Sequence, residues 1–128
     1  MRGEKLDFLD ISKLDKNQKR VFFLNVFFPG LGFFYCKEFL LGTIFGILSV
    51  LSIGGGILLI FKIPIATLFL WILGVSLHLL GIFYSTKITV KTQSTFIASV
   101  YILVSLAFLT YCFIEFFSKL LTVFKINV

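Results

Sequence analysis

Three long stretches without a charged residue constrain the fold of this chain more than any other feature. They cover residues 39–61, 63–86 and 92–114. Each is longer than the roughly 18 apolar residues that mark a helix able to cross the hydrocarbon core of a bilayer. Inside that core every backbone polar group needs a partner within the protein, and a single apolar run satisfies this need as a helix. The sequence therefore predicts an all-α membrane protein, a bundle of transmembrane helices.

A fourth uncharged stretch, residues 21–36, leaves the number of spans open. It is shorter than the other three, and Pro29 and Gly30 interrupt it. Proline removes a helical hydrogen bond and glycine permits a tight turn, so a straight helix is not assured. We expect four transmembrane helices or, alternatively, three plus a re-entrant hairpin. The expected domains are a cytoplasmic basic tail over residues 1–20 and a helical transmembrane domain over residues 21–128, with spans at about 21–36, 39–61, 63–86 and 92–114.

Composition and charge narrow the class further. Of the 128 residues 59% are hydrophobic and 14% are charged, which leaves too little polar surface to coat a soluble domain. The net charge is +6, but the basic residues flank the apolar stretches, so they indicate membrane topology and not a nucleic-acid partner. With either number of spans, nine of the 12 basic residues fall inside if the N-terminus is cytoplasmic. We therefore expect a multi-pass protein of the cell (inner) membrane with a cytoplasmic N-terminus, and the two arrangements differ in the side of the C-terminus.

Small residues mark the expected helix contacts. Gly42 and Gly46 form a literal GxxxG pattern, and Gly74 and Gly81 share one helical face. In lipid, burial against another helix gains no hydrophobic energy, so small residues that let backbones approach are enriched where helices touch. These four glycines are predicted to be packing positions. The glycine run at residues 54–56 indicates either close packing or a local unwinding of its helix.

His78 is the strongest candidate for an ionisable group inside a span. It lies on the same face as the small residues of its stretch. An ionisable side chain in the membrane marks a proton or ion pathway unless a hydroxyl or carbonyl of a neighbouring helix satisfies it. We favour the second interpretation and keep the pathway as an alternative.

The rest of the chain offers little for chemistry. One histidine and two distant cysteines, Cys36 and Cys112, with no acidic residue in the spans, make a metal site or a catalytic set improbable. We therefore expect no cofactor, no metal and no enzymatic activity. The two cysteines are placed near opposite faces of the bilayer, so no disulfide is expected between them.

Local signals place the helix ends. Ser12 and Asp15 read as a capping box that starts the first helix. Ser94 or Thr95 is the expected N-cap of the last helix, after a polar, water-exposed loop. The residues that follow Glu115 are expected to be the frayed end of that helix, lying at the membrane interface.

The segment around Pro29 resembles a known signature. Pro29, Gly30, Gly32, Tyr35 and Gly42 match the pattern P-G-L-G-x-x-Y-x-x-[QE]-x-x-x-G of small bacterial membrane proteins, which are similar to the two-helix transmembrane (TM-two type) domain family. The resemblance covers about the first third of the chain. It implies a helical hairpin around the motif, which favours four spans, and it implies no settled activity. The chain departs from the pattern where Phe follows Gly32 in place of the usual Gln, and where Cys follows Tyr35.

These features favour a non-catalytic multi-pass membrane protein that acts through helix–helix contacts. Its expected partners are the lipid bilayer and either further copies of itself or another membrane protein that it joins as a small subunit, with no nucleic acid. One alternative is a channel or transporter-like protein with a pathway near His78. The other is an immunity-type protein that blocks a pore-forming toxin.

Overall fold

The computed structural model describes residues 14–127, with side chains described to residue 125, and this part of the chain is helical without a strand. The all-α prediction is confirmed. The helices, in chain order, are α1 (Lys16–Phe27), α2 (Leu31–Tyr35), α3 (Phe39–Gly42), the π-helical turn η3 (Thr43–Ile47), α4 (Leu48–Leu59), α5 (Pro64–Tyr84) and α6 (Thr95–Asn127).

Three helices in the described part are long and apolar enough to cross a membrane. The first is the continuous rod Phe39–Leu59, made of α3, η3 and α4, and the others are α5 and the Thr95–Lys125 part of α6. The first two match the uncharged stretches 39–61 and 63–86, and the third begins in the stretch 92–114 and runs past its end. The prediction of three long apolar helices is confirmed. Pro64 stands in the first turn of α5, where its missing N–H costs no hydrogen bond, and it starts the helix directly after the short turn from α4.

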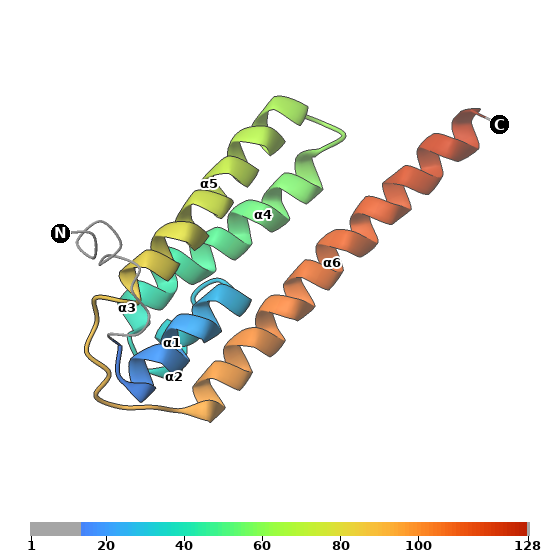
Figure 1. Ribbon diagram of the computed structural model, residues 1–128. Helices are drawn as coiled ribbons and strands as arrows, with labels where there is room; N and C mark the ends of the chain where they lie inside the picture. Colours follow the sequence, from blue (N-terminus) through green and yellow to red (C-terminus); the bar gives the residue numbers. More distant parts are fainter. Residues whose placement is uncertain (1–13, 128) are drawn as a thin grey trace.

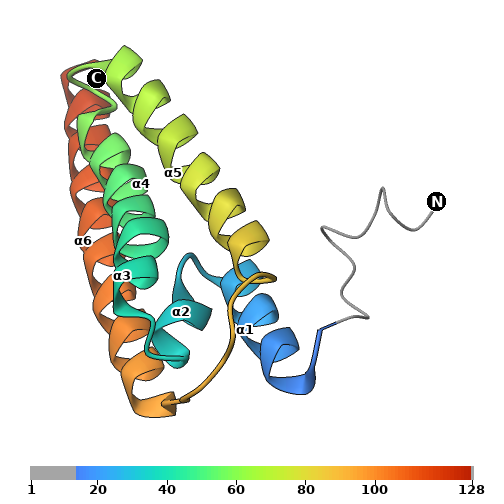
Figure 2. The same cartoon turned by 90° about the vertical axis from the view of Figure 1, so that its left-hand side faces the viewer.

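The fourth uncharged stretch is not one helix, and a count of four spans is not confirmed. The stretch is divided between α1 and α2, two short helices that meet at a turn. Phe28, the residue before Pro29, is extended and caps the end of α1. Gly30 is the N-cap of α2 with φ +75°, a left-handed conformation that glycine adopts without strain. Figure 2 shows α1 rising from one end of the molecule and α2 returning toward it. At 12 residues, α1 is about 18 Å long, too short for a core about 30 Å thick.

The start of α1 differs from the prediction. Asp15 is the N-cap, and it accepts a hydrogen bond from the Gln18 backbone at 2.8 Å while the Gln18 side chain accepts one from the Asp15 backbone at 3.1 Å. The capping box is thus shifted, because Asp15 and Gln18 also have the spacing that the motif needs. Ser12, the predicted cap, lies outside the described residues. Residues 16–20 of the predicted basic tail belong to α1.

At the other end of the chain, α6 is longer than predicted. Its 33 residues make a rod about 50 Å long. Ser94 caps its start, accepting a hydrogen bond from the Ile97 backbone at 3.2 Å. The helix continues through Lys119 to Asn127, so the expected frayed end after Glu115 is wrong. Figure 1 shows α6 lying beside α4 and the α1–α2 hairpin, then passing beyond the tip of the α4–α5 pair.

The tightest core lies around the hairpin. A cluster of buried apolar side chains joins α1, α2, the loop before α6 and the first turns of α6. Its members are Val21, Leu31, Phe33, Phe34, Tyr35, Cys36, Ile88, Ala98 and Tyr101. By contrast, the outer faces of α5 and α6 carry large apolar side chains that are more than half exposed, as suits helices that face acyl chains.

Candidate functional site

The Pro29-Gly30 turn sits directly on the GxxxG pattern. A Cβ on Gly30 would lie 2.4 Å from the Gly46 Cα, so two backbones touch here with no side chain between them. The Tyr101 hydroxyl of α6 donates a hydrogen bond to the Pro29 carbonyl. The turn is therefore fixed from two sides, by the π-helical turn η3 and by α6.

Asn25 and Gly32 hold the two arms of the hairpin together. The Gly32 N–H donates to the Asn25 side-chain oxygen at 2.9 Å. A Cβ on Gly32 would lie 2.2 Å from the Val21 carbonyl oxygen, so only glycine allows α2 to pack this closely on α1. Asn25 is 1% exposed, and its amide nitrogen finds no hydrogen-bond partner in the described part of the chain. Sequence reasoning missed Asn25, although it is the one amide in the apolar stretch 21–36.

At the other predicted packing glycines, the space beside the glycine is occupied by residues of the same chain. A Cβ on Gly42 would lie 2.7 Å from the Phe34 ring, and one on Gly81 would lie 2.9 Å from the Phe45 Cβ. Gly74 lies against α4, where its carbonyl accepts a hydrogen bond from the Ser49 hydroxyl at 2.6 Å. The small-residue faces thus serve contacts within one copy of the chain, and they leave no free glycine groove for another helix at these positions.

The glycine run in α4 packs closely and does not unwind. The helix is continuous from Leu48 to Leu59. Gly54 faces α6, because a Cβ there would lie 2.3 Å from the Phe108 ring, and Gly56 faces α5, because a Cβ there would lie 2.5 Å from the Trp71 nitrogen. The Thr67 hydroxyl donates to the Gly56 carbonyl at 2.8 Å. Gly55, between them, meets only a Leu side chain at ordinary contact distance.

His78 lies where α5 meets the hairpin. It is half-buried and lies near the Val26 backbone of α1. A backbone carbonyl can satisfy an imidazole N–H in the membrane. The packing interpretation of His78 stays a prediction.

Tyr35, the aromatic residue of the signature, links three segments. Its hydroxyl accepts a hydrogen bond from the Arg20 guanidinium of α1 at 3.1 Å and donates one to the Gln93 side chain at 2.8 Å. Its carbonyl accepts from the Ser94 backbone at 2.7 Å. The loop before α6 is therefore bound to the end of α2. It is also tied to α1, because the Gln18 side chain donates to the Ile88 carbonyl at 2.8 Å. Sequence reasoning treated Arg20 only as a topology signal and missed Gln93, since partners this far apart in the chain share no local pattern.

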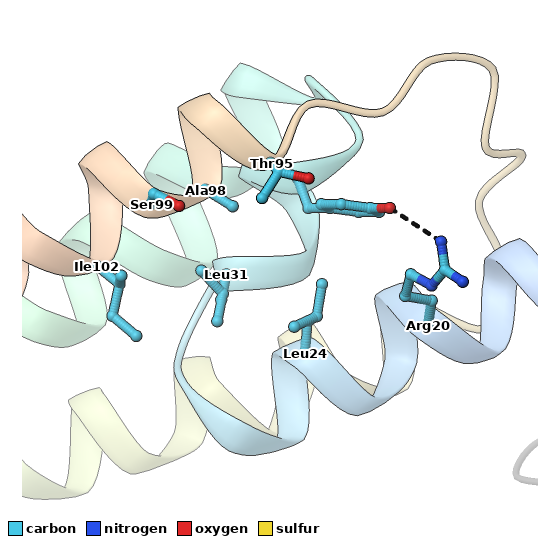
Figure 3. Close-up of a pocket in the computed structure, with 8 residues that line it drawn as sticks. Arg20, Leu24, Leu31, Thr95, Ala98, Ser99 and Ile102 are labelled. Atoms are coloured by element: carbon cyan, nitrogen blue, oxygen red, sulfur yellow. Dashed lines mark hydrogen bonds between the residues drawn. The ribbon is translucent and has the colours of Figure 1, made fainter.

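A cavity of about 400 Å³ opens between α1, α2 and α6 beside this link. Its lining residues are Arg20, Leu24, Leu31, Tyr35, Thr95, Ala98, Ser99 and Ile102. Figure 3 shows the Arg20 guanidinium at one end and aliphatic side chains of α1, α2 and α6 along the rest. The hydrogen bond between Arg20 and the Tyr35 hydroxyl lies at the Arg20 end. The cavity, which we call the Arg20 pocket, thus has a cationic mouth and an apolar interior.

The Arg20 pocket lies at the basic end of the molecule. This is the end where α1 and α6 begin and α2 and α5 terminate (Figure 2). The basic residues described at this end are Lys16, Lys19, Arg20, Lys37, Lys87 and Lys91, against the acidic Asp15 and Glu38. The opposite end, around the α4–α5 turn and the end of α6, carries Lys62, Lys119 and Lys125 with Glu115. The electrostatic potential therefore favours anions at the mouth of the pocket.

Cys36 and Cys112 are both buried and form no disulfide with each other. Burial raises the pKa of the Cys36 thiol, which keeps it protonated and poorly reactive. In residues 14–127 no three histidine, cysteine or acidic side chains gather closely enough to hold a metal ion.

Comparison with known proteins adds no relative to this picture. No family model, no curated protein and no solved structure matches the chain. The resemblance of the segment around Pro29 to the P-G-L-G-x-x-Y signature stays a prediction. The geometry of the turn stands independently of it, because Gly30, Gly32 and Tyr35 each have a physical role in this structure.

Proposed function

We propose that this protein is a non-catalytic multi-pass membrane protein that acts by assembling with other membrane chains, either copies of itself or a larger complex. In this proposal α4, α5 and α6 cross the cell (inner) membrane, and the α1–α2 hairpin is embedded in its cytoplasmic half. The Arg20 pocket then opens near the cytoplasmic surface.

The charge distribution supports this orientation. Six described basic residues lie at the basic end and three at the opposite end, and cytoplasmic segments carry the excess of Lys and Arg in membrane proteins. The N-terminus is therefore cytoplasmic. Three crossings place the end of α6 outside.

The extension of α6 is the observation that carries the assembly proposal. A rod about 50 Å long fits a core about 30 Å thick only at a tilt of about 53°, beyond the usual range of up to about 40°. Near the tip of the α4–α5 pair, the Phe116 ring of α6 stacks on the Phe61 ring, with centroids 5.4 Å apart. Beyond it, Phe117, Leu121 and Phe124 are each more than half exposed.

Those side chains favour a protein partner. Lys119 and Lys125 in the same segment hold it out of the hydrocarbon core, because a charge there is costly. Apolar residues that emerge from the core lose contact with acyl chains, and clustered exposed apolar surface marks an interaction site. A second helix against this face of α6 would cover it.

Photo-crosslinking tests the assembly. A photoreactive amino acid is placed at Leu121 in the full chain, and the matched control carries it at Leu68, an equally exposed position on the lipid-facing side of α5. We expect membranes to yield a specific adduct from position 121 that mass spectrometry identifies as a second copy or as one defined membrane protein. The control should yield mainly lipid adducts. Lipid adducts alone at both positions would refute assembly through α6.

The two other functional hypotheses gain no specific support. The pathway near His78 and the immunity role against a pore-forming toxin both stay predictions. The glycine run at residues 54–56, for which local unwinding was the alternative to close packing, lies within a continuous helix packed against α5 and α6.

A further inference from the structure

We propose that the Arg20 pocket binds an anionic membrane lipid, with the headgroup phosphate at Arg20 and the upper part of one acyl chain between α1 and α6. This inference rests on the proposed orientation, which places the pocket at the cytoplasmic surface. It is independent of the assembly of α6 with other chains.

The mouth of the pocket has free capacity for an anion. The guanidinium of Arg20 has five N–H donors in a planar fork, and in the described part of the chain its one hydrogen bond goes to the Tyr35 hydroxyl. That hydrogen bond orients the fork without neutralising its charge. The Thr95 hydroxyl lines the same cavity from the first turn of α6, and Ser99 lies further along that helix, beside Ala98 and Ile102 (Figure 3). A phosphate at the mouth would therefore meet the charged fork of Arg20, which forms strong, charge-assisted hydrogen bonds with phosphate.

The interior selects a lipid over a soluble anion. Behind Arg20 the walls are the aliphatic side chains of Leu24, Leu31, Ala98 and Ile102 (Figure 3). A volume of about 400 Å³ lies within the range of known ligand pockets, and a free phosphate would leave most of it unfilled. The cavity is not enclosed, so an acyl chain can enter it.

The setting matches the location of such lipids. The cytoplasmic leaflet is the anionic one, and basic pockets between transmembrane helices on that side bind anionic headgroups. Nearby Lys residues of the basic end raise the local concentration of anionic lipid in general, but Arg20 is the cation that lines the cavity. Selective binding should therefore depend on Arg20 and not equally on every lysine of that end.

Native mass spectrometry of the purified full chain in mild detergent tests this assignment. The probes are phosphatidylglycerol and phosphatidylcholine with identical acyl chains. We expect one phosphatidylglycerol to be retained preferentially, and we expect Arg20→Gln to reduce that preference about fivefold to tenfold, since a basic residue near an anionic surface contributes about 1 kcal/mol and an ion-paired one more. Lys91→Gln is the matched control, because it removes the same charge from the same end at a residue that does not line the cavity.

A second variant separates the pocket from the charge. Ser99→Leu keeps Arg20 but fills the cavity from α6, where Ser99 is exposed, so it should lower phosphatidylglycerol retention without unfolding the protein. Equal losses in Arg20→Gln and Lys91→Gln, or unchanged retention in both Arg20→Gln and Ser99→Leu, would overturn the proposal. Displacement of the lipid by excess inorganic phosphate would overturn the assignment to a lipid. None of these outcomes affects the crosslinking result at Leu121. The proposal of lipid binding and the proposal of assembly through α6 can therefore fail independently.

Discussion

Replacing Gly30 by alanine should strongly destabilise the protein. Two costs combine at this position. A left-handed conformation costs an L-residue roughly 1–2 kcal/mol, and Gly30 has φ +75°. The added Cβ would also lie 2.4 Å from the Gly46 Cα, which is backbone and cannot rotate away, and such overpacking costs about 1–3 kcal/mol. The expected loss is therefore about 2–5 kcal/mol.

Gly55→Ala is the matched control, and its expected change in stability has the opposite sign. A Cβ there meets only the Leu70 side chain at 3.7 Å, an ordinary contact. Gly55 lies inside α4, where alanine is favoured over glycine by about 0.5–1 kcal/mol in water. The same added methyl group should thus stabilise one helix of the protein and disrupt the turn.

Thermal unfolding in detergent micelles, followed by circular dichroism at helical wavelengths, measures both variants against the parent chain. We expect a lower midpoint for Gly30→Ala and an unchanged or higher midpoint for Gly55→Ala. If Gly30→Ala unfolds at the parent temperature, the close contact between the turn and η3 does not exist in the folded protein. Equal destabilisation by both variants would mean that any added methyl group in a glycine position is harmful, and the argument from geometry would fail.

Two further predictions address the hydrogen bond between Tyr101 and the Pro29 turn, and the membrane topology. Tyr101→Phe removes the hydrogen bond to the Pro29 carbonyl and should lower the free energy of unfolding by about 0.5–1.5 kcal/mol, whereas Tyr111→Phe, at a side chain that is 55% exposed, should leave the midpoint within error. A reporter enzyme that is active only outside the cytoplasm, fused after residue 128, should be active if α4, α5 and α6 are the three spans. The same reporter fused before residue 1 should be inactive, and activity in the reverse pattern would contradict the positive-inside assignment.

The three long apolar helices were predictable because their physical cause is local. A bilayer core demands a long run without charge, and residues 39–61, 63–86 and 92–114 meet that demand without reference to any other part of the chain. The turn at Pro29 and Gly30 was visible for the same reason. What could not be read locally is whether the chain on either side of the turn crosses the membrane. That depends on where α1 starts. The sequence offers two capping boxes, Ser12 with Asp15 and Asp15 with Gln18, and the structure has the second.

The residues that contact the glycines could not be predicted from the sequence, for a different reason. A glycine spacing predicts that a backbone comes close, but it does not say which one. Gly46 meets the Pro29-Gly30 turn and Tyr101, so a GxxxG pattern that is typical of dimers is filled within the chain. The link from Arg20 through Tyr35 to Gln93 was hidden likewise, because each residue has an ordinary local role and only the fold brings the three together.

The length of α6 was underestimated because the charged residues after the apolar run were taken as the end of the helix. Glu115 closes the uncharged run, and Lys119 and Lys125 follow it; these charges limit the part of the helix that can lie in hydrocarbon. They do not limit the helix itself, which needs only its own backbone hydrogen bonds. Polar residues of the extension recur at three- and four-residue spacing, at Glu115, Ser118, Lys119 and Thr122, and such spacing gathers them on one face. The opposite face keeps Phe117, Leu121 and Phe124, so the segment has the pattern of a helix that packs one side against a partner.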